Sequence, residues 1–106
     1  MSEIRTDTIN NASGDNDSGI DLSTNDQVSI KTANTTRATV DSNGNVILSS
    51  NEPTLFLKDS NNANTTRYIK NNAEIFTIGR INDDLSASSV EHLRVDDSGN
   101  LLVGTT

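Results

Sequence analysis

The side chains that could carry out chemistry are few. The chain has a single histidine, His92, and no cysteine, so a histidine-rich metal site and a zinc-thiolate site are both excluded. A Ser-His-Asp triad would have to use His92 as its histidine, and nothing in the sequence around this residue indicates such an arrangement. Adjacent carboxylates occur at 83–84 and 96–97, and paired carboxylates are what glycoside hydrolysis requires. Asp41 and Asp96 stand beside the two predicted turns, where aspartate commonly caps its own backbone, so we interpret them as turn residues. With no indication of a triad or of a catalytic carboxylate pair, we expect no catalytic residue and a protein that is not an enzyme.

One acidic stretch partly resembles a calcium-binding loop. Asp15, Asp17 and Asp21 are spaced as oxygen ligands of such a loop could be. The helix-flanked calcium loop wants Asp or Asn at its fifth position and Gly at its sixth, where this chain has Gly19 and Ile20. We therefore favour a solvated turn and expect no cofactor, with a calcium ion near the three aspartates as the lesser alternative.

Two stretches, 40–48 and 95–103, repeat one pattern and predict two β-hairpins. In each, a turn dipeptide ending in glycine separates two runs of β-branched and aliphatic residues. A two-residue loop at Asn43-Gly44 would place Val40 opposite Ile47, and the second copy would pair in the same way. With that pairing neither hairpin has one apolar and one polar face, so both faces would need partners.

The remaining sequence predicts further strands and no helix. Alternation of apolar and polar residues favours strands over 3–9, 28–32, 53–59, 67–70 and 74–81. The pentapeptide Ala-Asn-Thr-Thr-Arg occurs at 33–37 and again at 63–67, and its Asn-Thr-Thr is expected to form a loop each time. All three aromatic residues lie within 53–81, which is the expected core. We predict an all-β, elongated structure of repeated β-hairpins, with a polar attachment segment over 1–32 and the repeated region over 33–106.

The composition limits the core that one copy can build. Hydrophobic residues make up 31% of the 106 residues, with two Phe, one Tyr and no Trp, so the large aromatic anchors of compact cores are nearly missing. Small chains compensate for a thin core with disulfides, a metal or oligomerisation. Because cysteine is absent, oligomerisation is the leading expectation.

The charge and hydropathy of the chain limit its partners. A net charge of −7 argues against nucleic acid and anionic membranes, since both would repel the chain. No apolar run approaches the ~20 residues that span a bilayer, and the opening residues lack the apolar core of a signal peptide. We expect no nucleic-acid partner, no membrane insertion, and synthesis in a host cytoplasm without export by that route.

Several phrases of the sequence carry a family resemblance. They are Arg-x-x-Val-Asp-Ser-x-Gly-Asn-Val at 37–46, Leu-Arg-Val-Asp-Asp-Ser-Gly-Asn-Leu-Leu-Val-Gly-Thr-Thr at 93–106, Pro-Thr-Leu-Phe-Leu-Lys-Asp at 53–59 and Ser-Glu-Ile-Arg at 2–5. With these phrases the chain resembles the repeats of tail-fibre and related virion fibre proteins of tailed bacteriophages. The resemblance implies a homotrimer of intertwined or side-by-side strands, a structural role and a place in the virion, often with a part in host recognition.

The residues themselves agree with the resemblance on one point. Strands with apolar groups on both faces gain stability by burying the second face against another copy. The positions expected to form inter-chain seams are Val40, Val46, Leu48, Leu55, Leu57, Val95, Leu101 and Val103.

The expected function is a short tail fibre or fibre-attachment component that assembles as a trimer and helps to position host-recognition elements. Residues 1–32 are expected to meet other tail or virion proteins, because they lie outside the repeated units. One alternative is a capsid decoration or head-fibre protein. Another is a module that binds a host-surface glycan, for which Tyr68 combines an aromatic face with a hydroxyl.

Overall fold

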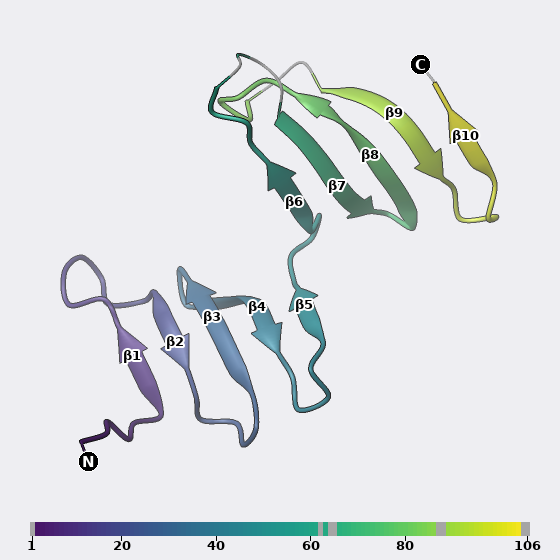
Figure 1. Ribbon diagram of the computed structural model, residues 1–106. Helices are drawn as coiled ribbons and strands as arrows, with labels where there is room; N and C mark the ends of the chain where they lie inside the picture. Colours follow the sequence, from purple (N-terminus) through teal and green to yellow (C-terminus); the bar gives the residue numbers. More distant parts are fainter. Residues whose placement is uncertain (1, 62, 64–65, 87–88, 105–106) are drawn as a thin grey trace. The chain divides into compact units, whose positions relative to one another are not determined.

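The chain is all-β, as its sequence predicts. A computed structural model describes residues 2–61, 63, 66–86 and 89–104, and over these residues it contains ten strands in two antiparallel five-stranded sheets and no helix (Figure 1). Residues 1–50 and 51–106 form separate compact units, each with one sheet. The predicted division at residue 32 does not coincide with this boundary, because strands on either side of it pair with each other.

The first sheet is a meander in which each strand pairs with the next along the chain. Its strands are β1 (Thr8–Asn10), β2 (Gly19–Asp21), β3 (Val28–Thr32), β4 (Thr35–Val40) and β5 (Val46–Leu48). The strand predicted over 3–9 begins only at Thr8, and β2 forms inside the stretch read as a solvated turn. The tight turn between β3 and β4 is Ala33-Asn34, whose φ angles of 49° and 56° are typical of a two-residue hairpin loop. The first Asn-Thr-Thr is therefore not a loop, because Thr35 already belongs to β4.

The second sheet is also a meander, in the order β10-β9-β8-β7-β6. Its strands are β6 (Thr54–Leu57), β7 (Thr66–Asn72), β8 (Ile75–Ile81), β9 (Val90–Val95) and β10 (Leu101–Val103). These strands match the predicted ones closely, and a tight turn at Ala73-Glu74, again with positive φ, joins β7 to β8. Asn64 and Thr65 of the second pentapeptide lie outside the described residues.

The register of the hairpin β4–β5 differs by one residue from the prediction. Val40 pairs with Val46 rather than with Ile47. The loop has three residues, because the N–H of Asp41 donates to the carbonyl of Asn45 at 3.0 Å and closes the ladder one residue earlier. Gly44, with φ of 84°, takes the left-handed position that such a loop needs at its third residue.

The Asp41 side chain explains why the longer loop forms. Its carboxylate accepts hydrogen bonds from the backbone N–H groups of Asn43 at 3.0 Å and Asn45 at 2.9 Å, and from the Asn45 side-chain amide at 3.0 Å. The predicted capping of the turn is thus confirmed. A one-residue shift moves one strand's side chains to the other face, so Ala38, Val40, Val46 and Leu48 share one face and the prediction of mixed faces is wrong.

The hairpin β9–β10 has the same construction 55 residues later. Val95 pairs with Leu101, and Asp96 accepts the same three hydrogen bonds, from the Ser98 N–H, the Asn100 N–H and the Asn100 side chain. Gly99 has the same φ of 84° as its counterpart. The two hairpins are therefore equivalent residue by residue.

A β-bulge precedes each of these hairpins at the equivalent place. In the first sheet Ile30 pairs with Ala38 and Lys31 with Thr36, which leaves Arg37 as the extra residue. In the second sheet the pairs on either side of the bulge leave His92 as the extra residue. The carbonyl groups of the two bulged residues accept equivalent backbone hydrogen bonds, at 2.8 Å in the first sheet and 2.7 Å in the second.

Little apolar surface is buried within either unit. Tyr68, 5% exposed, is the one buried large hydrophobic side chain in the described part of the chain, whereas Phe56 and Phe76 are exposed. The expectation of an aromatic core over 53–81 is therefore wrong except at Tyr68. The other buried side chains are small and polar: Ser29, Thr39, Thr66 and Thr77, of which Thr66 is fully buried. Each unit is a single-layer sheet rather than two packed layers.

Candidate functional site

Each sheet carries a row of aliphatic residues that crosses all five strands. In the first sheet the directly paired residues are Ile9, Ile20, Ile30, Ala38 and Leu48. In the second sheet they are Leu55, Ile69, Ile78, Leu93 and Val103. Directly paired residues in antiparallel strands point to the same side of the sheet. Each row therefore lies on one side, which we call the apolar face of that sheet.

A second apolar row lies beside the first on each apolar face. It consists of Val28, Val40 and Val46 in the first sheet and of Phe76, Val95 and Leu101 in the second. Most of these side chains are exposed, Val46 by 71% and Val103 of the neighbouring row by 75%. The apolar faces are therefore candidate contact surfaces, because exposed apolar patches on a protein mark sites of interaction.

All eight residues predicted to form inter-chain seams lie on the apolar faces. Val40, Val46 and Leu48 belong to the first sheet. Leu55, Leu57, Val95, Leu101 and Val103 belong to the second. Seven of them are exposed and Val95 is half-buried. The predicted register had divided the residues of each hairpin between two faces, whereas the observed register gathers them on one. The role of these residues in contacts between copies stays a prediction.

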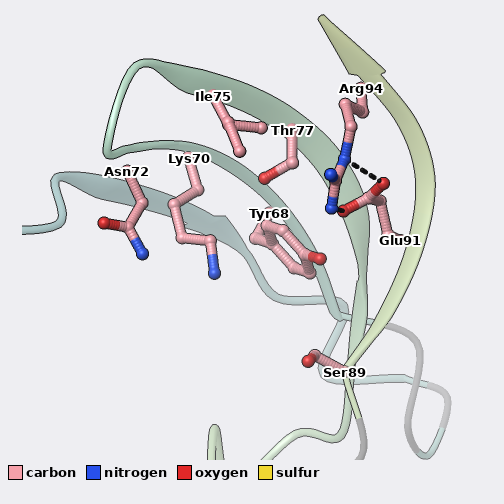
Figure 2. A pocket seen from close by; sticks show the side chains of 8 residues that line it. All are labelled: Tyr68, Lys70, Asn72, Ile75, Thr77, Ser89, Glu91 and Arg94. Carbon is pink, nitrogen blue, oxygen red and sulfur yellow. Dashed lines mark hydrogen bonds and ion pairs between the residues drawn. The ribbon is translucent and has the colours of Figure 1, made fainter. Parts of the chain in front are cut away.

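The opposite side of the second sheet, which we call its polar face, holds a pocket of about 230 Å³. Figure 2 shows the side chains that line it, which come from β7, β8 and β9 and, at Ser89, from the residue just before β9. The lining residues are Tyr68, Lys70, Asn72, Ile75, Thr77, Ser89, Glu91 and Arg94. A second hollow of about 320 Å³ shares Tyr68, Lys70 and Ser89 with it and extends toward β6.

The ion pair in the pocket exists because of the bulge at His92. Residues three apart on a regular strand point to opposite faces, but the extra residue brings Glu91 and Arg94 to the same face. The Arg94 Nε and Nη2 donate to the two carboxylate oxygens of Glu91 at 2.8 and 2.9 Å (Figure 2). The hydrogen bonds that Arg94 donates to Glu91 raise the pKa of Arg94, and the bidentate geometry fixes both side chains.

Tyr68 and Lys70 form the other side of the pocket. The Lys70 ammonium lies 5.4 Å from the centroid of the Tyr68 ring and forms an ion pair with Glu52 at 2.7 Å. The Tyr68 ring lies over Gly79 of β8, where an added Cβ would come within 2.5 Å of the tyrosine hydroxyl. Because Tyr68 is almost fully buried, its ring does not offer the open stacking surface that the glycan-module hypothesis assigned to it.

Thr77 lines the same pocket from β8. Its side chain is 6% exposed, and its hydroxyl oxygen has no hydrogen-bond partner among the described residues. In Figure 2 this oxygen is turned toward the side of the pocket where Tyr68 and Lys70 lie. A buried hydroxyl without a partner is costly and needs a reason.

The acidic residues singled out from the sequence are mostly occupied by local hydrogen bonds. Asp83 accepts from the Thr66 hydroxyl at 2.9 Å and Asp84 from the Ser86 hydroxyl at 2.7 Å, and the latter bond lowers the pKa of Asp84. The carboxylates at 83–84 therefore serve the loop between β8 and β9. Asp96 caps its turn, as described above.

The predicted calcium ligands do not form a ready-made cluster. Asp21 accepts hydrogen bonds from the hydroxyl and N–H of Ser23, which lower its pKa, whereas a hydrogen bond with Asp15 raises the pKa of Asp17. Within the described ranges no group of three acidic, histidine or cysteine side chains is arranged to hold a metal. The calcium hypothesis stays a prediction without structural support.

Reasoning from the sequence missed the pocket. Its residues are spread over positions 68–94, and they meet only through the pairing of β7 with β8 and β8 with β9. The one available signal was Gly79 inside a strongly apolar strand, because glycine in a strand interior often marks the close approach of another group.

The comparisons and the search for membrane spans add no assignment. No protein-family model matches the sequence, and the search of curated proteins returns no significant match. The described residues include no helix suited to crossing a membrane.

Proposed function

We propose that this protein is a non-enzymatic structural component of a tailed-bacteriophage virion, a short tail fibre or fibre-attachment piece that assembles as a homotrimer. The observation that carries the proposal is the pair of apolar faces, each with an unbroken five-strand row of aliphatic residues. The resemblance of the repeated hairpins to virion fibre proteins supports the same assignment.

The energetics favour assembly of copies. Full burial of one Val, Leu or Ile side chain stabilises by roughly 1.5–3 kcal/mol relative to full exposure. Because many residues of these rows are exposed in a single chain, assembly can still supply a large part of that stabilisation. A symmetric trimer makes each such contact three times. A single-layer sheet with one apolar face needs a second layer, and sister copies supply it without any further sequence.

In this proposal residues 1–32 meet other tail or virion proteins, and the localisation is the virion. Residues 8–32 provide β1, β2 and β3, so the attachment surface would be carried by the outer part of the first sheet and the residues before it. Their polar composition suits a surface that docks after folding rather than one that forms a core.

Sedimentation equilibrium of the purified chain tests the assembly. We expect a folded species with three times the 11.4 kDa mass of one chain. A stable, folded monomer at all concentrations would contradict the proposal. Density for the chain in a map of the whole particle would then separate a tail position from the alternative of a capsid decoration or head fibre.

A further inference from the structure

The polar face of the second sheet carries a feature that assembly through the apolar face does not use. Its pocket has a volume of about 230 Å³, below the roughly 300–1,000 Å³ of typical drug-sized sites. We propose that this pocket binds a single neutral sugar ring, held by hydrogen bonds to Thr77, Glu91, Arg94 and Lys70. The inference does not rest on the proposed trimer, because one chain supplies every lining residue.

The first observation that supports this binding site is the unpartnered hydroxyl of Thr77. The equivalent residue in the first sheet is Ser29, whose hydroxyl lies 3.4 Å from that of Thr39 and is satisfied there. In the second sheet the residue equivalent to Thr39 is Arg94, which bonds Glu91 instead. Thr77 therefore keeps an available donor and acceptor inside a hollow, which a bound hydroxyl group would satisfy.

The charged side chains that line the pocket favour a neutral ligand over an anionic one. Arg94 is paired with Glu91 and Lys70 with Glu52, so each cation of the pocket already has a carboxylate beside it. An anionic ligand would have to compete with these carboxylates, whereas a neutral one would not. The lining also offers fixed donors and fixed acceptors side by side. Sugar hydroxyls both donate and accept, so they match such a mixed surface.

The geometry also excludes recognition by stacking. The Tyr68 ring is covered and already faces the Lys70 ammonium. Binding therefore depends on hydrogen bonds to groups held by the Glu91–Arg94 pair, and the ring serves as the floor of the pocket. A site that depends on placed polar groups loses affinity strongly when one of them is removed.

Backbone amide shifts of the ¹⁵N-labelled full chain, followed during titration, test the proposal. The probes are glucose, galactose and N-acetylglucosamine as neutral sugars, with glucuronate and inorganic phosphate as anionic counterparts, each up to about 100 mM, where a ligand with a Kd of ~1 mM saturates. We expect saturable shifts confined to β7, β8 and β9 with at least one neutral sugar. Shifts with the anions alone, or none with any probe, would overturn the proposal.

Thr77→Val is the decisive variant, because it keeps the shape of the side chain and removes only the hydroxyl. We expect it to fold and to weaken sugar binding about fivefold, the effect of one hydrogen bond. Thr39→Val at the place equivalent to Arg94 in the first sheet is the matched control and should leave binding unchanged. Equal binding by wild type and Thr77→Val would overturn the site. The sedimentation mass of the same samples shows separately whether the trimer forms.

Discussion

The two sheets share one half of their construction and differ in the other. Both have the bulge, the Asp-capped three-residue loop and the five-strand aliphatic row at equivalent places. On the opposite side the first sheet places small hydroxyl residues, Thr36 and Thr39, where the second sheet places Glu91 and Arg94. The features shared by the two sheets are therefore those that assembly through the apolar faces would need in both units. The opposite, polar sides differ, so they can serve a different role in each unit.

A single residue illustrates the difference. Lys31 of the first sheet and Gly79 of the second occupy equivalent places beside the bulge. The glycine leaves room for the Tyr68 ring, which a side chain at that place would displace. The second unit thus has a glycine where the first has a half-buried lysine, and the space beside this glycine holds the buried Tyr68 ring, which forms the floor of a pocket.

The largest effect is expected from charges on an apolar face. Leu48→Asp places a carboxylate in the aliphatic row, whereas Ile47→Asp places one on the opposite side of the same strand. Both wild-type side chains are 43% exposed, so the pair is closely matched. We expect Leu48→Asp to weaken assembly by about 3 kcal/mol, roughly a hundredfold, and Ile47→Asp to leave it intact. Similar sedimentation profiles for the two variants would contradict the prediction that only the apolar face takes part in assembly.

The pair at 47 and 48 also shows how far the sequence could be read. Alternation and turn residues were sufficient to predict the all-β class, most strands and both hairpins. The side on which each residue falls was not predictable, because it depends on whether the loop has two residues or three. That choice is made by the Asp41 carboxylate and the left-handed Gly44, and a one-residue change inverts the faces.

The pocket was beyond prediction for a related reason. Glu91 and Arg94 share a face only because of the bulge at His92, and no local pattern in the sequence announces a bulge. In the same way β2 was missed because its three residues, Gly19–Asp21, are held by pairing with β1 and β3 on either side rather than by their own propensity.

The next effect in size tests the exchange of lysine for glycine. Gly79→Ala would crowd the carbonyl of Val90 and the Tyr68 ring, and we expect a loss of about 1–3 kcal/mol in the free energy of unfolding of the second unit. Lys31→Ala at the equivalent place should change stability by less than about 0.5 kcal/mol. Near-ultraviolet circular dichroism of Tyr68, the single tyrosine, follows the unfolding of the second unit, and backbone amide signals of the first sheet follow that of the first unit. Equal stabilities for the two variants would contradict the role given to Gly79.

Smaller, equal effects are expected from the glycines of the two loops. Gly44 and Gly99 both have φ of 84° and open space around them, so alanine at either place is opposed only by the backbone conformation. We expect each substitution to cost about 1 kcal/mol of the free energy of unfolding, measured by thermal denaturation. Clearly unequal costs would show that the two loops are not equivalent in solution.

The smallest effect is a shared dependence on pH. Hydrogen bonds from Asn45 and Asn100 hold the pKa values of Asp41 and Asp96 below the ordinary 3.8. A lowered pKa in the folded state means that the contribution is complete above about pH 4 and is lost as the pH falls through the lowered values. The double variant Asp41→Asn with Asp96→Asn should therefore lose stability less steeply below pH 4, measured by denaturant unfolding across pH. An acid limb as steep as that of the wild type would contradict the capping role.

The most direct test of the account uses the absence of cysteine from the chain. Ile47→Cys and Leu48→Cys each introduce one thiol, on opposite faces of β5, and the rate of maleimide labelling measures how accessible each face is in the assembled protein. We predict rapid labelling at position 47 and strong protection at position 48 in the native protein, and equally rapid labelling at both positions when the assembly is unfolded in denaturant. Equal rates at the two positions in the native protein would contradict the claim that sister copies cover the apolar faces.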